Sequence, residues 1–366
     1  MRAAVLRSFE RDMDIEDVPV ADPRDREVLV RIMATGVCAS DLSTIRGKTS
    51  AALPLIPGHE AAGIVERVGS GVSKVQPGDR VVLSWAPNCG HCFYCQDSHP
   101  TLCDVYGGAA SSGGLWDGTS RLGPIGAPIR HYSCVSSFAE LAVVPETGCI
   151  KIDPDVPFAV AALVGCAVTT GFGAVINDAA VRAGDAIGIM GVGGVGINAI
   201  QAARLAGAET IIALDTNIGK AELARANGAT HFINAADRDG LEQVRALTSG
   251  RGVDHMVECT GHPAAMSAAY AMTRPAGNVV IVGIAPKGTD LAVPAIGFPG
   301  SKKRIIGSIY GGGVPERDIT KILALYRAGR LALDSQIGKR IGLAQVNDAL
   351  KWLEQGVQAR TIIEFA

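Results

Sequence analysis

Strand and helix patterns alternate along the second half of the chain, and this alternation restricts the possible folds more than any other feature. The segments DAIGIM, TIIALD, HFIN, HMVECT and NVVIVGI have the length and apolar content of buried strands. Helical patterns over residues 194–205 and 218–227 separate the first three of them. Strands that alternate with helices of this length form a parallel sheet. The pattern therefore predicts an α/β fold with a doubly wound parallel sheet.

A glycine-rich turn follows the first of these strands and opens a helix, with the order G-x-G-x-x-G. The turn consists of Gly191, Gly193, Gly194, Val195 and Gly196, with one further residue between the first two. In this context the glycines let backbone N–H groups approach a pyrophosphate at the helix N-terminus. Asp215 ends the next strand, where an acid accepts hydrogen bonds from an adenosine ribose and repels a 2′-phosphate. NAD is therefore expected rather than NADP, although Asp215 could also be a solvated turn residue.

Residues 1 to about 150 have a different pattern, that of a β-rich region. Short apolar runs such as EVLVRIMA, AGIVERVG and DRVVLSW are separated by turns that contain Gly and Pro. The stretch Val105–Arg130 is rich in Gly, Ser and Pro, which predicts a long loop. After about Ile305 we expect helices over Thr320–Gly329 and Leu343–Gln355, and then a last strand, ARTIIEFA.

The composition excludes several classes of function. A length of 366 residues suggests about two domains. The net charge of −2 gives no broad attraction to nucleic acid or to an anionic membrane. The longest apolar run, Phe158–Thr170, is too short to span a bilayer. The first residues contain no uninterrupted apolar segment of the kind that a secretory signal needs, so a cytoplasmic location is expected.

Four of the nine cysteines lie close together with the spacing C-x2-C-x2-C-x7-C. They are Cys89, Cys92, Cys95 and Cys103. Four thiolates surround one Zn²⁺ tetrahedrally and leave no open position, which favours a structural zinc site. Two disulfides or unrelated buried cysteines are the alternative, which a reducing compartment disfavours.

Three further residues have the chemistry of an open zinc site but lie far apart in the sequence. Cys38 occurs in GVCASD, His59 in PGHE and Cys166 in VGCAVTTG. A catalytic zinc needs three protein ligands and one free position. Each residue alone could equally be a buried cysteine or a hydrogen-bonded loop histidine, and spacing alone does not join the three.

The order of these motifs resembles that of the zinc-containing alcohol dehydrogenases of the medium-chain dehydrogenase/reductase family. The segments GVCASD, GHEAAGIVERVG, the four-cysteine run, GCAVTTG and GVGGVG follow one another as in that family, and the similarity runs from about residue 3 to 366. The resemblance implies a GroES-like, β-rich catalytic domain formed by residues 1–167 and 310–366. It also implies a Rossmann domain over residues 168–309 that binds NAD.

The resemblance also implies the roles of the zinc-site residues. Cys38, His59 and Cys166 match the ligands of the catalytic zinc, and Glu60 matches an acidic neighbour that can approach the metal. Asp41 matches the carboxylate that orients the histidine ligand. Ser40 matches the hydroxyl that hydrogen-bonds the substrate oxygen. Zinc would lower the pKa of the alcohol, Ser40 would pass the proton on, and the hydride would move to the nicotinamide. Two zinc ions per subunit are expected, one catalytic and one structural.

Further residues are implied for the cofactor and the substrate. Lys220 matches a residue that reaches the ribose, Arg360 one that reaches the pyrophosphate, and Thr170 and Val282 residues that flank the nicotinamide. Trp85 is expected to line the substrate pocket beside the zinc, although it could be a core residue. Weaker pocket candidates are Thr49, Gly108, Ile284 and Ile309. A wide indole next to the zinc favours primary alcohols, among them aromatic or medium-chain ones.

The chain departs from the family pattern near the catalytic motif. Ala39 stands where relatives often have Arg or His against the pyrophosphate, and Ser43 stands where they often have the histidine of a proton relay. Water or Ser43 is then left as the exit for the proton.

The sequence leaves two alternative functions open and predicts one oligomeric state. The DGTSR segment, Asp117–Arg121, resembles that of thiol-adduct formaldehyde dehydrogenases, but Gly107 replaces the arginine that binds the adduct. An inactive cofactor-binding scaffold protein is the second alternative, which the retained zinc-site residues disfavour. The apolar segment Leu291–Ser308 predicts a homodimer, because pairing would cover a sheet edge.

Overall fold

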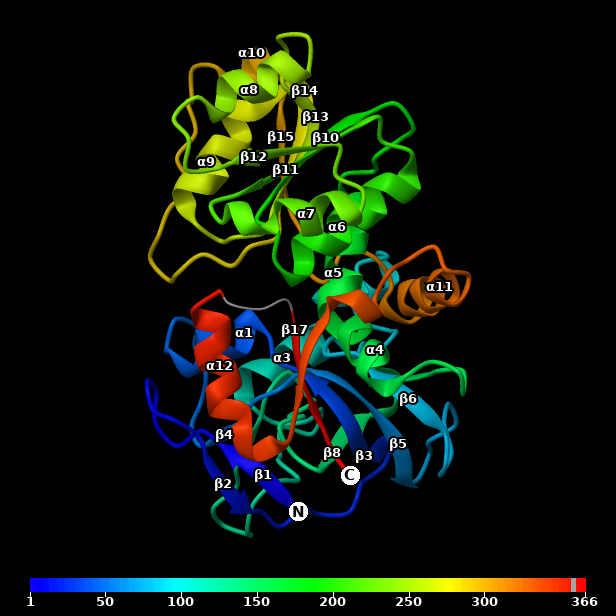
Figure 1. Cartoon of the computed structure of the whole chain (residues 1–366). Helices are drawn as coiled ribbons and strands as arrows, with labels where there is room; N and C mark the ends of the chain where they lie inside the picture. Colours follow the sequence, from blue (N-terminus) through cyan, green and yellow to red (C-terminus); the bar gives the residue numbers. More distant parts are fainter. Residues whose placement is uncertain (357–359) are drawn as a thin grey trace. The chain divides into compact units, whose positions relative to one another are not determined.

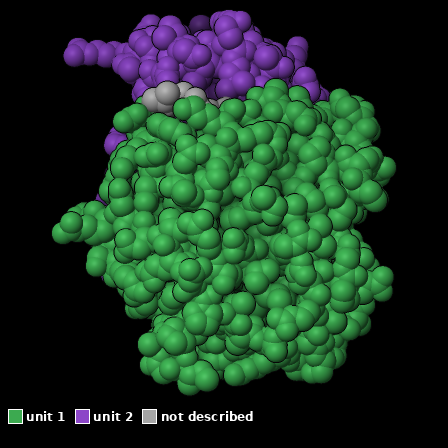
Figure 2. Space-filling view, turned by 60° about the horizontal axis from the view of Figure 1, so that its bottom comes forward, with its two compact units in different colours: residues 1–167, 314–366 green, residues 168–313 purple. Residues whose placement is uncertain are grey.

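The computed structural model describes residues 1–356 and 360–366 and divides the chain into two compact units. Unit 1 contains Met1–Ala167 and Val314–Ala366, and unit 2 contains Val168–Gly313 (Figure 2). We expected the chain to leave the second unit after residue 309, whereas it leaves after Gly313. The contacts of Gly311 explain the four additional residues, because its carbonyl accepts a hydrogen bond from Asn177 Nδ2 at 2.8 Å, within unit 2.

Unit 2 is built on a six-stranded parallel sheet (Figure 1). Its strands are β10 (Ala186–Met190), β11 (Thr210–Asp215), β12 (His231–Asn234), β13 (Val253–Glu258), β14 (Thr273–Ile281) and β15 (Arg304–Gly307). They lie in the order β12-β11-β10-β13-β14-β15, and every neighbouring pair is parallel. The order reverses direction next to β10, which confirms the expected doubly wound sheet. In such sheets ligands bind at the carboxyl ends of the strands beside this reversal.

Helices connect the strands of unit 2. They are α6 (Gly194–Ala206), α7 (Ala221–Ala226), α8 (Gly240–Leu247), α9 (Pro263–Met272) and the short α10 (Phe298–Ser301), with the 3₁₀ turn η5 (Ile218–Lys220) before α7. Helix α6 begins at Gly194, as the glycine motif predicts. A Cβ atom at Gly196 would lie 1.9 Å from the Gly191 carbonyl oxygen, so no other residue fits this close approach of strand and helix.

Unit 1 is β-rich, and its main sheet has seven strands. They are β3 (Glu27–Gly36), β5 (Glu60–Val68), β6 (Arg80–Leu83), β8 (Leu141–Pro145), β9 (Cys149–Lys151), β16 (Ile337–Ile341) and β17 (Arg360–Glu364). Two small sheets add β1 (Arg2–Val5) with β2 (Asp14–Asp17), and β4 (Leu55–Ile56) with β7 (Arg130–His131). The last strand, β17, pairs with β3 in antiparallel orientation. The C-terminal segment is therefore part of the first unit, beside the strand that leads to Cys38.

Seven helical segments of unit 1 bear on the site and on the expectations from sequence. They are α1 (Ala39–Ile45), α2 (Phe93–Gln96), α3 (Asp104–Ser112), α4 (Phe158–Leu163), α11 (Pro315–Arg327), the 3₁₀ turn η7 (Leu343–Gln345) and α12 (Val346–Glu354). The two C-terminal helices were expected at 320–329 and 343–355. The first begins earlier, because Pro315 occupies an initial helical position, where its missing N–H is not needed.

The expectation of one long loop over residues 105–130 is wrong for its first part. Helix α3 occupies Asp104–Ser112 and ends at Gly113, whose φ is +67°. Tyr106 and Ala109 form the buried side of this helix, three residues apart. Two glycines within the helix obscured the signal, since glycine is a poor helix former.

A second correction concerns the length of the apolar segment that begins at Phe158, which the sequence placed at Phe158–Thr170. The helix continues through Asp178, for 21 residues, and includes two π-helical stretches, η3 (Val164–Val168) and η4 (Ala174–Asp178). Among the described residues it is the one helix long and apolar enough to cross a membrane. In this structure 94% of its most apolar stretch is buried inside the protein, and buried core helices have the same length and composition. Its first π-helical stretch carries Cys166.

Candidate active site and metal centres

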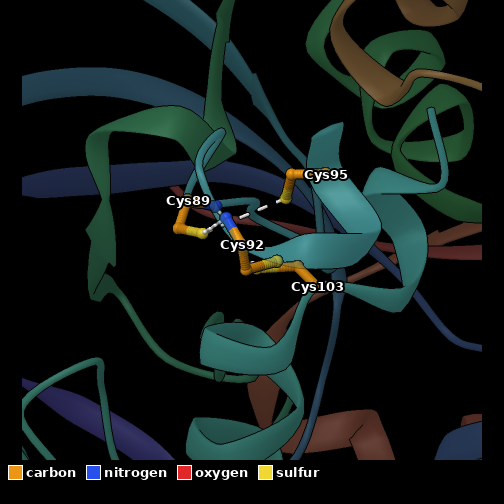
Figure 3. A group of neighbouring side chains, drawn as sticks. All are labelled: Cys89, Cys92, Cys95 and Cys103. Atoms are coloured by element: carbon orange, nitrogen blue, oxygen red, sulfur yellow. Dashed lines mark hydrogen bonds between the residues drawn. The ribbon is translucent and has the colours of Figure 1, made fainter. Parts of the chain in front are cut away.

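The four clustered cysteines converge in one loop of unit 1. Their sulfur atoms all lie within 4.8 Å of one another (Figure 3). Cys92 and Cys103 are the residues before α2 and α3, so two helix starts help to close the loop. Backbone N–H groups of Cys89 and Cys92 donate to the sulfurs of Cys103 and Cys89, both at 3.3 Å. This arrangement of four sulfurs with backbone donors fits a closed tetrahedral metal site.

The surroundings of these sulfurs affect their ionisation differently. The backbone N–H of Cys95 is the main cause that lowers the pKa of Cys92, to about 6. Burial is the main cause that raises the pKa of Cys95, to about 12. A divalent cation stabilises thiolates and would therefore deprotonate both residues, so metal binding should release protons.

The second group of metal-binding side chains is buried and consists of Cys38, His59, Glu60 and Cys166. One ligand atom from each lies within 4.8 Å of the others. Cys38 immediately precedes α1, His59 precedes β5, and Glu60 is the first residue of β5. Cys166 comes from the π-helical stretch of the long apolar helix. The fold of unit 1 therefore brings together the residues that sequence spacing alone could not join.

Asp41 holds this group in place from the first turn of α1. It is 0% exposed and accepts three hydrogen bonds. His59 Nδ1 lies 3.0 Å from Asp41 Oδ1, and the Gly58 N–H donates to the same oxygen at 3.1 Å. The Cys38 N–H donates to Oδ2, also at 3.1 Å. Asp41 thus orients the imidazole and leaves Nε2 as the histidine atom that can bind a metal.

Charges inside the site oppose the effect of burial on His59. Burial would lower the pKa of the imidazole, but the Asp41 carboxylate and Cys38 outweigh it, and the pKa is raised to about 10. A hydrogen bond between the two sulfurs lowers the pKa of Cys38 well below its ordinary value and raises that of Cys166. A cation among these atoms would displace the protons of His59 and Cys166.

Glu60 is a buried carboxylate with one oxygen available to the site. Its Oε2 pairs with the Arg360 guanidinium, and both side chains are buried. Its Oε1 has no hydrogen-bond partner among the described residues. An orphaned buried carboxylate oxygen next to two cysteines and a histidine fits a metal ligand. Arg360, which was expected at a pyrophosphate, contacts Glu60 in this structure, and its contact with a cofactor stays a prediction.

Aromatic side chains surround the buried site. The Trp85 and His59 rings are 6.4 Å apart, edge to face, and the Trp85 side chain acts to lower the pKa of Cys166. Tyr132 lies edge-on to His59 at 5.6 Å, and Tyr106 from α3 lies 6.2 Å from Trp85. Trp85 also packs against the core beside β5 and β6. The pocket and core interpretations of Trp85 are therefore compatible.

Sequence reasoning missed Tyr106 and Tyr132. Tyr106 lies in the segment expected to be a loop, and only the helical spacing of Tyr106 and Ala109 could have indicated a buried position. Tyr132 follows β7, a strand of two residues that is too short to give a sequence pattern.

The remaining pocket candidates are spread over both units. In unit 1, Thr49 hydrogen-bonds Thr44, and a Cβ atom at Gly108 would meet open space. In unit 2, Ile284 and Ile309 are 69% and 43% exposed. Their part in a pocket stays a prediction.

The glycine motif and Asp215 form the second candidate site, within unit 2. Gly191 has φ +95°, and a Cβ atom at Gly193 would meet open space. The Asp215 carboxylate accepts a hydrogen bond from the Val192 N–H at 2.8 Å and pairs with Lys220 Nζ at 2.9 Å. The acid at the end of β11 is thereby fixed to the glycine turn, with Lys220 beside it. Two nicotinamide candidates are in the same unit: Thr170 is buried, and the Val282 N–H donates to the Glu258 carbonyl at 2.8 Å.

The DGTSR segment has a structural explanation. Arg121 is 1% exposed and forms two hydrogen bonds with the Glu27 carboxylate, at 2.6 and 2.8 Å. It also binds Asp117 Oδ2 at 2.7 Å. The segment therefore anchors the loop after α3 to the start of β3. The DGTSR segment thus has a structural role in this chain.

Known proteins support the zinc interpretation. Residues 24–154 match the family described as alcohol dehydrogenase GroES-like domain, and residues 194–327 match the family described as zinc-binding dehydrogenase. The chain is 37% identical to an NDMA-dependent alcohol dehydrogenase of Amycolatopsis methanolica, over 99% of this chain and 98% of that protein. It is also 37% identical to the S-(hydroxymethyl)glutathione dehydrogenase of Synechocystis sp., over 100% of this chain and 99% of the relative.

A solved structure agrees over the whole length. The crystal structure of benzyl alcohol dehydrogenase from Acinetobacter calcoaceticus matches with a TM-score of 0.94 and 32% identity, and the match covers 100% of this chain and 99% of that one. Together with the two metal-binding groups, these matches define an oxidoreductase of the zinc-binding dehydrogenase class. The chain belongs to the zinc-containing alcohol dehydrogenases of the medium-chain dehydrogenase/reductase family.

Proposed function

We propose that the protein oxidises primary alcohols to aldehydes reversibly, with NAD as hydride acceptor and two zinc ions per chain. The observation that carries the proposal is the convergence of Cys38, His59, Glu60 and Cys166 within 4.8 Å, with Asp41 on His59. Two cysteines, one histidine and a carboxylate fit an open zinc site, which lowers the pKa of an alcohol and polarises a carbonyl. The four-cysteine group would hold the second, structural zinc.

The residues of unit 1 have separate tasks in this proposal. Asp41 keeps His59 in the tautomer that turns Nε2 to the metal. Ser40, half-buried in α1 with Oγ 3.8 Å from Cys38 Sγ, hydrogen-bonds the substrate oxygen and takes up its proton. The aromatic rings of Trp85 and Tyr132 exclude water from the reacting atoms.

NAD is proposed as the cofactor on the basis of the charge at the end of β11. The buried Asp215 carboxylate, fixed by the Val192 N–H, would accept hydrogen bonds from a ribose diol and repel a 2′-phosphate. Lys220 is an observation in favour of NADP, because its ammonium group lies beside Asp215, and a similar solved structure, a putative zinc-binding dehydrogenase from Sinorhizobium meliloti, is bound to NADP. Since that group is already paired with Asp215, it only partly offsets the repulsion.

Primary alcohols are proposed because of the aromatic side chains beside the metal ligands. Trp85 lies edge-on to His59, so a second carbon on the carbinol would meet the indole. The open space at Gly107 and Gly108 would admit bulk farther out, such as a benzyl group. The relative in Acinetobacter calcoaceticus, a benzyl alcohol dehydrogenase, is consistent with this substrate class.

Oxidation of a glutathione adduct of formaldehyde is the second candidate. The relative in Synechocystis sp., an S-(hydroxymethyl)glutathione dehydrogenase, favours it. Gly107 argues against it, because it provides no cation for the carboxylates of the thiol. An inactive scaffold protein is not favoured, since the metal-binding residues are present in both groups.

The test is an absorbance assay at 340 nm with a panel of primary and secondary alcohols, run with NAD and with NADP. A second series contains formaldehyde with and without glutathione. A third uses NDMA as acceptor, because one relative is named for its dependence on that compound. Formation of NADH from benzyl alcohol without a thiol is expected. Activity only with the glutathione adduct, or one zinc or none by elemental analysis, would refute the proposal.

We also propose that the protein acts on small molecules in the cytoplasm and does not bind nucleic acid or membranes. Two chains are further proposed to form a homodimer through Leu291–Ser308. Strand β15 is at the end of its sheet, and Ile296 nearby is 98% exposed. Pairing of this edge with a second copy would satisfy its backbone groups and cover the apolar side chains. Light scattering that shows a monomer or a tetramer would contradict the dimer.

A further inference from the structure

Three side-chain hydroxyl groups form a continuous hydrogen-bonded chain in unit 1. Thr44 Oγ1 lies 3.1 Å from the Tyr132 hydroxyl oxygen and 2.8 Å from Thr49 Oγ1. Both distances are those of hydrogen bonds. Because each hydroxyl both donates and accepts, a row of them can take up a proton at one end and release another at the other end.

The inner end of this hydroxyl chain lies at the candidate active site. The Tyr132 hydroxyl donates to the Ser40 carbonyl at 3.3 Å, and its ring lies edge-on to His59 with centroids 5.6 Å apart. Ser40 Oγ is in turn 3.8 Å from Cys38 Sγ. The hydroxyl of Tyr132 is therefore next to the residue that would take the proton of the alcohol.

The outer end of the hydroxyl chain leads toward solvent. Thr44 is 1% exposed, so the middle of the chain is shielded from water. Thr49 is half-buried, and its neighbours Lys48 and Ser50 are exposed. Thr49 is thus the end of the chain whose sequence neighbours are in contact with water.

The neighbouring Ser43, which was considered as an exit, is not connected to this chain. Its carbonyl accepts a hydrogen bond from the Lys48 N–H at 2.9 Å, which continues the backbone of α1. Within residues 1–356 and 360–366, its side-chain hydroxyl has no hydrogen-bond partner. Thr44, one position later on α1, has two partners and is directed inward.

We propose that Tyr132, Thr44 and Thr49 form the route by which the proton of the alcohol leaves the active site. The inference rests on the proposed alcohol oxidation. The O–H bond of the substrate breaks and Ser40 Oγ takes the proton while it passes its own to a water molecule, which in turn passes one to the Tyr132 hydroxyl held beside the Ser40 carbonyl. Tyr132 passes one to Thr44, Thr44 one to Thr49, and surface water accepts the last. The carbinol hydride, with both electrons, goes to NAD⁺, so no hydroxyl is oxidised or left charged.

The test separates proton release from turnover by means of 2,2,2-trifluoroethanol, an alcohol that is not readily oxidised. The enzyme, loaded with zinc and NAD⁺, is mixed with this alcohol, and proton release is followed with a pH indicator in a stopped-flow instrument. Thr44→Val removes the middle hydroxyl at constant shape, and Tyr132→Phe removes the inner one but keeps the ring on His59. Both should slow proton release on the order of 100-fold, the lower end of the effect of a positioned proton-transfer group.

Two matched variants complete the experiment. Thr44→Ser keeps a hydroxyl at the central position and should restore most of the rate lost in Thr44→Val. Ser43→Ala should release protons as fast as the unmodified protein. Zinc content and the NAD dissociation constant should stay unchanged in all four variants, which shows that the site is intact.

The outcomes are distinct. Proton release at the unmodified rate in both Thr44→Val and Tyr132→Phe would overturn the route, and so would slow release in Ser43→Ala alone. An unmodified protein that oxidises no alcohol would instead overturn the proposed function. Slow proton release in Thr44→Val with recovery in Thr44→Ser would support the route. A change in packing alone would not be reversed by restoring a hydroxyl group.

Discussion

Replacing Asp41 by asparagine should weaken metal binding at the buried site and leave the four-cysteine site intact. The Asp41 carboxylate is fully buried and accepts hydrogen bonds from His59 Nδ1, the Gly58 N–H and the Cys38 N–H. Asparagine has nearly the same shape but no charge, and only one of its two terminal atoms is an acceptor. With its oxygen toward His59 and Gly58, its NH₂ group would face the Cys38 N–H, donor against donor.

The size of the effect follows from these three contacts. Loss of the partner that orients a metal-binding histidine costs about 10- to 100-fold in metal affinity, which corresponds to about 1.4–2.7 kcal/mol. The lost hydrogen bond from Cys38 to a charged acceptor should also lower the free energy of unfolding by about 1.5–3 kcal/mol. The four-cysteine group has its own backbone donors and should keep its affinity.

In the zinc-loaded protein, competition with a chromogenic chelator measures the metal affinity of the two proposed zinc sites, because the weaker site releases its metal first. Asp41→Asn should release one zinc at a lower chelator concentration than the unmodified protein and retain the second. Asp22→Asn is the matched control, since the Asp22 side chain is 76% exposed and pairs with Arg67 at the surface. Unchanged affinity of both sites in Asp41→Asn, or equal weakening of both, would refute the role of Asp41 derived from its contacts.

Four further predictions concern separate parts of the chain. Trp85→Ala should raise kcat/KM for 1-phenylethanol relative to benzyl alcohol, by up to about 100-fold if the indole displaces the secondary carbinol by about 1 Å; an unchanged ratio would make Trp85 a core residue only. The unmodified protein should have a kcat/KM for NAD at least about tenfold higher than for NADP, or about 1.4 kcal/mol. Asp215→Gly should narrow this difference between the cofactors. Equal kcat/KM values in the unmodified protein would contradict the prediction. Arg121→Ala should lower the free energy of unfolding in urea by about 3–5 kcal/mol, because it leaves the buried Glu27 carboxylate without its partner; a loss below about 1 kcal/mol, the range of surface pairs, would argue against a structural anchor. Burial and the Arg121 charge lower the pKa of His131 to about 3, so the unfolded chain binds more protons than the folded one between about pH 6.5 and 3. The stability contributed by neutral His131 should therefore be lost as pH falls through this window. His131→Gln should flatten the pH dependence of the melting temperature in the same window, and an unchanged slope would contradict this prediction.

Local patterns allowed several features to be predicted from the sequence. The four cysteines lie within one short loop, so their spacing already limits how far apart the sulfurs can be, and the structure brings them within 4.8 Å. The glycine motif acts through backbone contacts between adjacent elements, and α6 begins where it predicted. The doubly wound sheet followed from the alternation of strands and helices, because each parallel connection needs a helix to cross the sheet.

Other features depend on contacts between distant parts of the chain, which no local pattern records. Cys38, His59 and Cys166 meet only because β3, β5 and the first part of the long apolar helix pack together in unit 1. From the sequence, only the family resemblance indicated that these three residues form one site. Helix α3 was not predicted from the sequence because it contains two glycines, and this helix places Tyr106 beside Trp85.

The partners of individual polar groups were also decided by the tertiary structure. Arg360 meets Glu60 across 300 residues of sequence, Arg121 is buried against Glu27 from 94 residues away, and Tyr132 reaches Thr44 from 88 residues away. A buried charge or hydroxyl must find a partner wherever the folded chain offers one. The residue types and many of the elements can therefore be predicted from the sequence, whereas the pairing of buried polar groups is a property of the packed fold.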